Sequence, residues 1–191
     1  TPNQPYIQIV TDQDYPIQAT GPVVVGQFVA SQQKAGIPST LPGGDPSFIL
    51  LPSVEQFRSE YLFLTPDKYA FDFVLGSATW GAVVTLDGRT LTKGCDSTTG
   101  KKICCTVAEV GKVRRPKDVE DTVYQSYKCQ LSFPVVHMGK VPPDNLLPGD
   151  QNDGVHRLKS NLPAGLVVYG FDAYVSYGYP GGTDLALINL K

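Results

Sequence analysis

The stretch that decides the fold runs from residue 48 to residue 89, FILLPSVEQFRSEYLFLTPDKYAFDFVLGSATWGAVVTLDGR. It holds four short apolar runs, at residues 48–52, 61–64, 70–75 and 82–86, separated by turns that contain proline or glycine. Strands that recur about every ten residues are typical of sandwiches, barrels and propellers. The last run ends in Leu86-Asp87-Gly88-Arg89, and an Asp-Gly pair in this position predicts a tight hairpin turn.

The composition of the whole chain favours the same class of fold. Its 191 residues are 41% hydrophobic and include 19 Gly, 16 Pro and 10 Tyr, a mixture that suits short strands joined by tight turns. We therefore expect an all-β fold of antiparallel sheets, arranged as a sandwich or as propeller-like blades. Residues 1–191 would form a single β domain. Thr1 opens the sequence without a Met or an apolar leader, so we expect either that a leader has been removed or that this is one piece of a longer chain. The one weak helix candidate covers residues 119–127.

Two further apolar segments near the N-terminus are predicted to be strands. Residues 6–10 read Tyr-Ile-Gln-Ile-Val, and residues 22–29 read Pro-Val-Val-Val-Gly-Gln-Phe-Val. The second is so continuously apolar that we expect a central strand with both faces buried. Residues 31–46 are rich in proline and glycine and should form a surface loop. Near the C-terminus, residues 155–158 and 166–171 read as strands.

The four cysteines, Cys95, Cys104, Cys105 and Cys129, lie within one stretch of 35 residues. Their spacing does not match a zinc site, because adjacent cysteines cannot easily chelate one ion and no paired histidine follows. Disulfides are favoured over free thiols, and a bridge between the adjacent pair is sterically unfavourable. That leaves Cys95 bonded to one member of the pair and Cys129 to the other. We expect residues 93–150 to be a disulfide-stapled insertion and the compartment to be oxidising, hence secreted or cell-surface.

Charge and hydropathy exclude two classes of partner. The formal net charge is −2 and the isoelectric point is about 5.6, so the basic excess that neutralises phosphates is missing and nucleic acid is not an expected partner. The longest uninterrupted apolar runs are far shorter than the roughly 18 to 20 residues that span a bilayer. No membrane span is expected in this segment.

The sequence contains no recognisable catalytic motif. His137 and His156 lie in no metalloprotease or nucleophile-elbow pattern, and Gly100-Lys101-Lys102 lacks the pattern of a phosphate loop. The carboxylates that could still converge as a glycosidase pair are Glu55, Glu60, Asp67, Asp72 and Asp87. The oxygen-rich turn at Asp150, Asn152 and Asp153 fits turn chemistry better than a calcium loop, which would need a closing glutamate. We expect no enzyme activity, no metal and no cofactor.

Exposed aromatic side chains are the candidates for binding. Tyr174, Tyr177 and Tyr179 precede a flexible Pro-Gly-Gly turn, and such amphipathic rings are common where proteins bind sugars or other proteins. Several rings of this block, which also includes Tyr169 and Phe171, should instead pack in the core.

Three more residues complete the predicted site. Trp80 is expected to be a packing anchor or an exposed ring. Arg114 and Arg115 lie in the mixed-charge run at residues 112–121, which reads as a solvated loop or, less favourably, as an anion-binding arm.

Residues 51–69, 83–88, 153–158 and 168–182 together resemble the N-terminal domain family of the IgGFc-binding protein, especially its bacterial secreted members. The resemblance covers roughly residues 17–188 and, because that domain is usually longer, corresponds to its C-terminal part. It implies an extracellular β-rich module found beside mucin-like and adhesive domains, with no enzymatic residues. Nothing in this sequence identifies a residue that contacts an antibody.

Three functions remain open at this point. The leading hypothesis is an extracellular, non-catalytic adhesion or binding module that engages protein or glycan at the cell surface. The second is a structural subunit of a surface filament or layer, in which exposed strand edges and the arm at residues 1–10 pair with another copy. The third is a carbohydrate-active enzyme that uses carboxylates no motif reveals.

Overall fold

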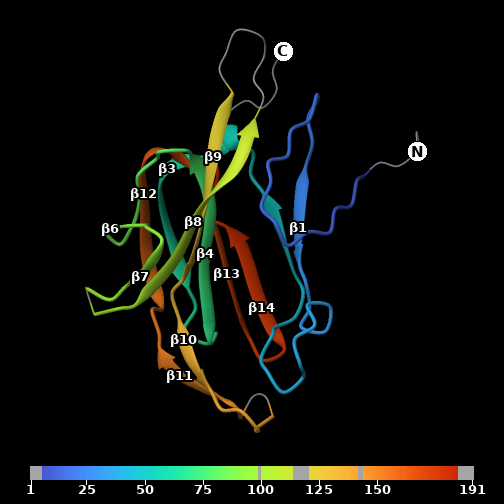
Figure 1. Ribbon diagram of the computed structural model, residues 1–191, viewed down its shortest axis with the longest axis vertical. Coiled ribbons are helices and arrows are strands. Elements are labelled where there is room, and N and C mark those ends of the chain that lie inside the picture. Colours follow the sequence, from blue (N-terminus) through green and yellow to red (C-terminus); the bar gives the residue numbers. More distant parts are fainter. Residues whose placement is uncertain (1–5, 99, 114–120, 142–143, 185–191) are drawn as a thin grey trace.

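The computed structural model describes residues 6–98, 100–113, 121–141 and 144–184. Within them, ten strands form one main antiparallel sheet that is curled into two facing layers (Figure 1). The first layer has the order β3 (Arg58–Thr65), β12 (Gly154–Ala164), β5 (Val84–Leu86) and β6 (Arg89–Thr90). The second has the order β14 (Val175–Pro180), β13 (Val167–Asp172), β4 (Phe71–Thr79), β9 (Thr122–Gln130), β8 (Ile103–Val113) and β7 (Gly94–Asp96).

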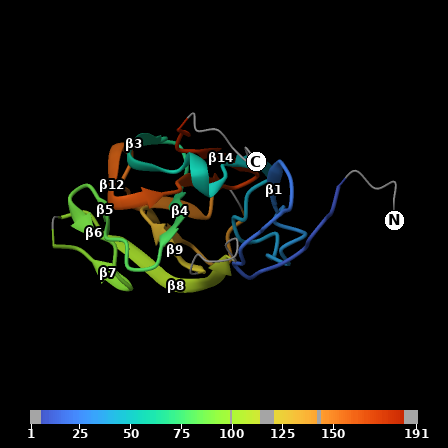
Figure 2. The same ribbon diagram turned by 90° about the horizontal axis from the view of Figure 1, so that it is seen from above.

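The layers enclose one hydrophobic core. Alternate residues of each strand point inward, so that Tyr61 and Phe63 of β3 face Val74 of β4 and Tyr127 of β9 across the core. Seen from above, the strands surround this core on both sides (Figure 2). The all-β prediction is confirmed, and a sandwich describes the fold better than propeller-like blades.

Smaller elements complete the description. The pair β1 (Val25–Val29) and β2 (Ser47–Leu51) and the pair β10 (Phe133–Val136) and β11 (Leu146–Asp150) each form a separate antiparallel sheet, and residues Val54–Gln56 form a turn of 3-10 helix. The predicted hairpin turn is confirmed, since Leu86 pairs with Arg89 and both Asp87 and Gly88 have positive φ. No helix in the described part of the chain is long and apolar enough to cross a membrane.

The two layers are joined where β12 bends into β13. Ala164 pairs with Ala78 there, the described pair that links β12 to β4. The hydroxyl of Tyr61 donates a hydrogen bond to the Ala164 carbonyl (2.6 Å), and the hydroxyl of Tyr127 donates one to the Gly165 carbonyl. These carbonyls lie in the buried bend, where an unpaired peptide group is costly. A tyrosine from each layer therefore stabilises the bend.

Gly76 makes this arrangement sterically possible. A Cβ atom at Gly76 would lie 2.0 Å from the Gly165 carbonyl oxygen and 2.3 Å from the Tyr127 hydroxyl. Burial also raises the pKa of Tyr127, so this hydroxyl remains protonated and remains a donor at ordinary pH.

The predicted disulfide pattern is confirmed, because Cys95 and Cys129 each bond one member of the adjacent pair. Cys95 is bonded to Cys104, and Cys105 is bonded to Cys129. Adjacent residues of a strand point to opposite faces, so the neighbouring cysteines of β8 reach different partners on β7 and β9. Cys105 and Cys129 lie in the core, whereas Cys95 is exposed. The segment expected as an insertion, residues 93–150, thus contributes β8 and β9 to the second layer, with β9 beside β4.

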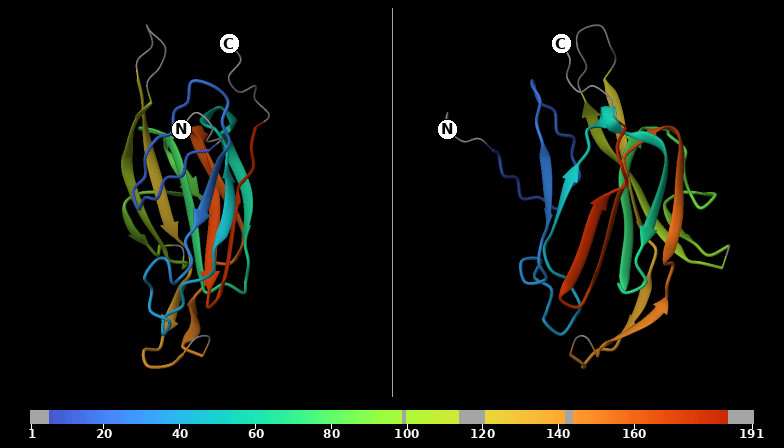
Figure 3. Two further views of the ribbon diagram at one scale, coloured as in Figure 1. Left: turned by 90° about the vertical axis from the view of Figure 1, so that its right-hand side faces the viewer. Right: turned by 180° about the vertical axis from the view of Figure 1, so that it is seen from behind.

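One strand prediction at the N-terminus is wrong, and a second is confirmed as a strand but wrong in its position. Residues 6–10 are extended but form no described ladder, and their side chains are exposed. Residues 22–29 were expected to be central, yet β1 covers only Val25–Val29 and belongs to a two-stranded sheet at one side of the molecule (Figure 3). Phe28 of β1 is 75% exposed. A continuous apolar run predicts burial only if another layer covers each of its faces, and here one face is left uncovered.

The helix candidate at residues 119–127 is also wrong in its described part. Residues from Thr122 onward belong to β9, where Tyr124 and Tyr127 are buried in the second layer. Residues 119 and 120 lie outside the described residues. The predicted loop at residues 31–46 is confirmed, since it contains turns and no strand.

The loop and β2 hold the N-terminal third of the chain against the second layer. The buried side chain of Ile49 packs on Gly178 of β14, where a Cβ atom would lie 2.5 Å from its terminal carbon. The backbone N–H of Asp45 donates a hydrogen bond to Ser176 Oγ (3.1 Å), and Lys128 of β9 forms an ion pair with Asp14 (2.9 Å). The attachment is therefore local, and much of β1 faces away from the sandwich.

We predict that Tyr127→Phe lowers the free energy of unfolding by about 1–3 kcal/mol, because it leaves the buried Gly165 carbonyl without a donor and keeps the ring in place. Urea denaturation monitored by circular dichroism measures this change. Tyr6→Phe is the matched control, since Tyr6 is 63% exposed. Equal loss in the two variants would contradict the role assigned to the Tyr127 hydroxyl.

We also predict that the two disulfides differ in their accessibility to reductant. A mild thiol should open Cys95–Cys104 at least about tenfold faster than Cys105–Cys129, because exchange requires access to the sulfur atoms and the second bond is buried. Alkylation followed by peptide mass spectrometry gives both rates. In denaturant the difference should disappear; if it persists there, burial is not its cause.

Candidate functional site

The tyrosines predicted at the binding rim lie in different environments. Tyr174 is 51% exposed, in the two-residue turn between Asp172 and Val175 that joins β13 to β14. Tyr177 and Tyr179 lie on β14 itself, and their side chains pack against the hydrophobic core. Of the three rings, only Tyr174 is therefore presented at the surface by its own hairpin tip.

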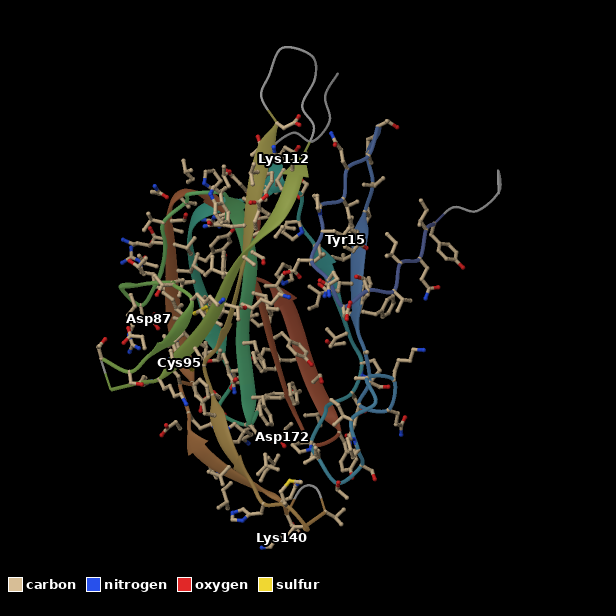
Figure 4. All side chains as sticks on the ribbon, in the orientation of Figure 1. Tyr15, Asp87, Cys95, Lys112, Lys140 and Asp172 are labelled. Atoms are coloured by element: carbon tan, nitrogen blue, oxygen red, sulfur yellow. A yellow bond between two sulfur atoms is a disulfide. The ribbon has the colours of Figure 1, made fainter. Side chains whose placement is uncertain are left out.

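Trp80, the other predicted binding residue that the structure describes, does not lie beside Tyr174, because it is bonded near the end of β9 that pairs with Lys112 (Figure 4). Trp80 is 52% exposed, and its backbone N–H donates a hydrogen bond to the Val123 carbonyl beyond the end of β4. Arg114 and Arg115 lie outside the described residues. Figure 4 places Asp172 at the lower end of the sandwich and Lys112 at the upper end. The β13–β14 tip and the end of the β8–β9 pair are thus on opposite sides of the molecule.

The hairpin that carries Tyr174 is anchored by a buried carboxyl group. Asp72 of β4 is fully buried, and it accepts hydrogen bonds from the Tyr177 hydroxyl (2.6 Å) and from Ser132 Oγ (2.8 Å). Gly170 leaves the necessary space, since a Cβ atom there would lie 2.3 Å from the Tyr177 ring. These contacts tie β14 to β4 across the intervening β13.

Burial dominates the electrostatics of this carboxyl group. It raises the pKa of Asp72 to about 6, although the hydrogen bonds from Tyr177 and Ser132 act in the opposite direction. Burial and the neighbouring Asp72 also raise the pKa of Tyr177, so its hydroxyl remains a donor. From the sequence Asp72 was only one of several candidate carboxylates, because its partners Ser132 and Tyr177 lie 60 and 105 residues away in the chain.

A second polar network surrounds His156 of β12. Its Nδ1 lies 2.7 Å from the Asp87 carboxylate, and its Nε2 lies 2.9 Å from both Thr65 Oγ1 and the Asn152 carbonyl oxygen. The backbone N–H of Arg157 also donates a hydrogen bond to the Asp87 carboxylate (2.9 Å). The ring also stacks on Phe63 at a centroid distance of 5.2 Å.

The order Thr65, His156, Asp87 resembles that of a nucleophile, a base and an orienting carboxylate. However, Thr65 is 1% exposed and its hydroxyl also lies within hydrogen-bond distance of the Asn152 carbonyl oxygen (3.2 Å). A substrate could not reach this hydroxyl without opening the fold. The network instead connects β3, β12 and the Asp87 turn. The sequence did not predict this network, because no motif places Thr65, Asp87 and His156 together.

Three of the carboxylates proposed for glycosidase chemistry, Glu60, Asp72 and Asp87, lie in separate environments. Glu60 forms an exposed ion pair with Arg157, Asp72 is enclosed by Tyr177 and Ser132, and Asp87 is bound to His156. The turn predicted at residues 150–153 is not seen: Asp150 ends β11, residues 151–153 connect it to β12, and the Asn152 carbonyl belongs to the His156 network. Among the described residues, no group of three or more His, Cys, Asp or Glu side chains could hold a metal ion.

We predict that Asp72→Asn removes a pH-dependent part of the stability. The pKa of Asp72 is higher in the folded state than the unfolded value near 3.9, so its contribution is fully present below about pH 4 and is lost as the pH rises through about 6. The difference in free energy of unfolding between the variant and wild type should therefore shift in favour of the variant by up to about 3 kcal/mol from pH 4 to pH 7.5. Urea denaturation at several pH values measures the difference. Asp45→Asn, at an exposed carboxyl, is the control, and parallel curves for wild type and Asp72→Asn would refute the prediction.

Comparison with known proteins supplies the family. The family model described as IgGFc binding protein matches residues 3–170, which is most of the chain. The match begins and ends earlier than the resemblance seen in the sequence, so the turn that holds Tyr174 lies beyond it. No curated protein and no solved structure matches the chain. The all-β sandwich, the two disulfides and the extent of the family match lead to one conclusion: the chain belongs to the IgGFc-binding protein family.

Proposed function

We propose that this protein is a non-catalytic binding module that works outside the cell and recognises a protein partner through the tip of the β13–β14 hairpin. Membership of the family supports the binding role in general terms. The two disulfides, one of them exposed, fit an oxidising environment and support a secreted or cell-surface location.

The observation that carries the proposed site is the conformation of Tyr174. Its φ is +64°, in the left-handed region that glycine adopts easily and that costs a side chain such as tyrosine about 1–2 kcal/mol. The ring is 51% exposed, so packing within the chain returns little of this cost. A strained, exposed aromatic residue is typical of a site whose use lies in contact with another molecule.

The rest of the hairpin holds this ring in place. Asp172 pairs with Val175 beneath the turn, and the Ala173 N–H donates a hydrogen bond to the Asp172 carboxylate. Ser176, which follows Val175 on β14, accepts at Oγ the hydrogen bond from the backbone N–H of Asp45. The neighbouring Gly44 lies against the Phe171 side chain. Because the tip is already ordered, little conformational entropy would oppose binding.

Protein is favoured over glycan as the partner because Val175, which is 43% exposed, adds an aliphatic surface beside the tyrosine. Sugar sites combine aromatic rings with polar groups that satisfy hydroxyls, whereas an aromatic ring next to an aliphatic side chain suits the core of a protein interface.

We predict that Tyr174→Gly weakens partner binding at least about tenfold while raising the free energy of unfolding by about 1 kcal/mol, because glycine relieves the strain and removes the ring. Biolayer interferometry should compare wild type and variant on immobilised Fc fragment, the ligand that the family description names, on mucin glycoprotein and on a glycan panel. Trp80→Ala removes an aromatic ring of similar exposure, 52%, at another place and is the control.

Three outcomes would refute parts of this proposal. Unchanged binding by Tyr174→Gly would remove the hairpin tip as the site, and loss of stability in that variant would assign the ring a packing role. Retention on glycans alone would exclude a protein partner. Cleavage of any glycan by the wild-type protein would contradict a non-catalytic function.

A further inference from the structure

The N-terminal third of the chain exposes an unusually large apolar surface. It consists of the side chains that line the segment at residues 6–24 and the outer face of the β1–β2 sheet, and we call it the N-terminal apolar surface: Tyr6, Ile7, Ile9, Val10, Ile17, Val23, Val24, Phe28, Phe48 and Leu50. Each is at least 51% exposed, and Ile7 reaches 88%. Such patches on soluble proteins usually mark sites of association.

The pairing register of β1 and β2 explains why Phe28, Phe48 and Leu50 face outward together. Phe28 pairs with Phe48, and their rings lie 4.8 Å apart. Leu50, two residues after Phe48, shares this face, whereas the intervening Ile49 points inward and is buried against Gly178. The inner face of β2 is therefore covered by β14, and the outer face has no cover from the described residues.

The edge of this sheet is open as well. Among the described strands, β1 pairs only with β2. An edge strand presents unpaired N–H and C=O groups that can accept another strand, and two-stranded sheets are marginally stable by themselves. The β1 edge is thus able to extend the sheet by one strand.

The same chain contains an unpaired segment suited to that place. Residues 6–10, Tyr-Ile-Gln-Ile-Val, have strong strand propensity, yet they are exposed and form no described ladder. The ion pair between Asp14 and Lys128 fixes the chain to β9, and Figures 2 and 3 show the preceding residues extending away from the body. The segment is therefore placed to reach another molecule.

Charge favours a second copy as that molecule. No charged residue occurs from Tyr6 to Thr11 or from Tyr15 to Gln33, and the net charge of the chain is only −2. A surface without charges meets an identical surface without repulsion, whereas it offers nothing to attract a strongly charged partner. Tyr6, Phe28 and Phe48 are aromatic side chains, which can bury about 150–250 Å² each, and the seven aliphatic side chains of the surface add to this area. A stable complex buries about 800 Å² per partner.

We infer that two copies of this chain associate through the N-terminal apolar surface, with the segment at residues 6–10 of each copy adding as a strand to β1 of the other. The exchange is reciprocal, so it closes on a pair and leaves no open end. This surface is separate from Tyr174, and the inference does not depend on the proposed function.

The test is the mass of the intact chain in solution. Light scattering coupled to size-exclusion chromatography, from about 1 μM to about 100 μM, should show a species of twice 20.6 kDa that dissociates on dilution. The double variant Ile7→Lys/Ile9→Lys in the donated segment and, separately, Phe28→Lys in the receiving strand should each raise the dimer dissociation constant at least about tenfold, because each places a charge in the apolar contact.

Gln8→Lys is the matched control, because it adds a charge to the same segment at a polar position. Circular dichroism should show that all variants keep the fold of wild type, since the substituted side chains are exposed. A constant mass of 20.6 kDa throughout the concentration series would overturn the inference. Growth beyond two copies would overturn the reciprocal exchange, and a dimer that the three apolar substitutions leave intact would overturn the assigned surface.

Discussion

The fold depends on satisfying the peptide groups of the bend between β12 and β13. This bend is the place where one layer of the sandwich continues into the other, so its carbonyls are buried and cannot be hydrated. Tyr61 and Tyr127 donate hydrogen bonds to two successive carbonyls, one from each layer, and the Gly165 N–H donates to the Ser77 carbonyl. A buried peptide group without a partner costs about 1–3 kcal/mol. The hydroxyls therefore determine where the two layers can join.

Side-chain hydrogen bonds also satisfy the buried polar groups of the two networks inside the sandwich. Asp72 receives hydrogen bonds from Tyr177 and Ser132, while His156 bridges Asp87 and Thr65. The Asp72 network connects β14 to β4, which no described backbone ladder joins directly, whereas the His156 network adds side-chain contacts between strands that are already paired, β12 with β3 and β12 with β5. Such groups specify one arrangement of the strands, because any other register would leave them buried and unpaired. Their burial also explains why these side chains, whose types occur in active sites, serve the fold here.

The two surfaces proposed for binding lie outside this well-satisfied interior. Tyr174 stands on a hairpin whose neighbouring residues are anchored through Asp72 and through Asp45, whereas the N-terminal apolar surface lies on a sheet attached mainly by Ile49. The first surface is small and rigid, which suits recognition. The second is broad, apolar and open at its edge, which suits pairing with an identical strand.

Sequence alone determined the features that depend on local chemistry. The Asp87-Gly88 pair predicts its hairpin because both residues tolerate positive φ, and the adjacent Cys104 and Cys105 require separate partners because neighbours on a strand point apart. Only the tertiary structure decided which strands lie beside one another. It placed residues 25–29 at a free edge, turned Tyr177 inward and Tyr174 outward, and assembled the His156 network. These outcomes depend on contacts between residues up to 131 positions apart, for which the local pattern carries no signal.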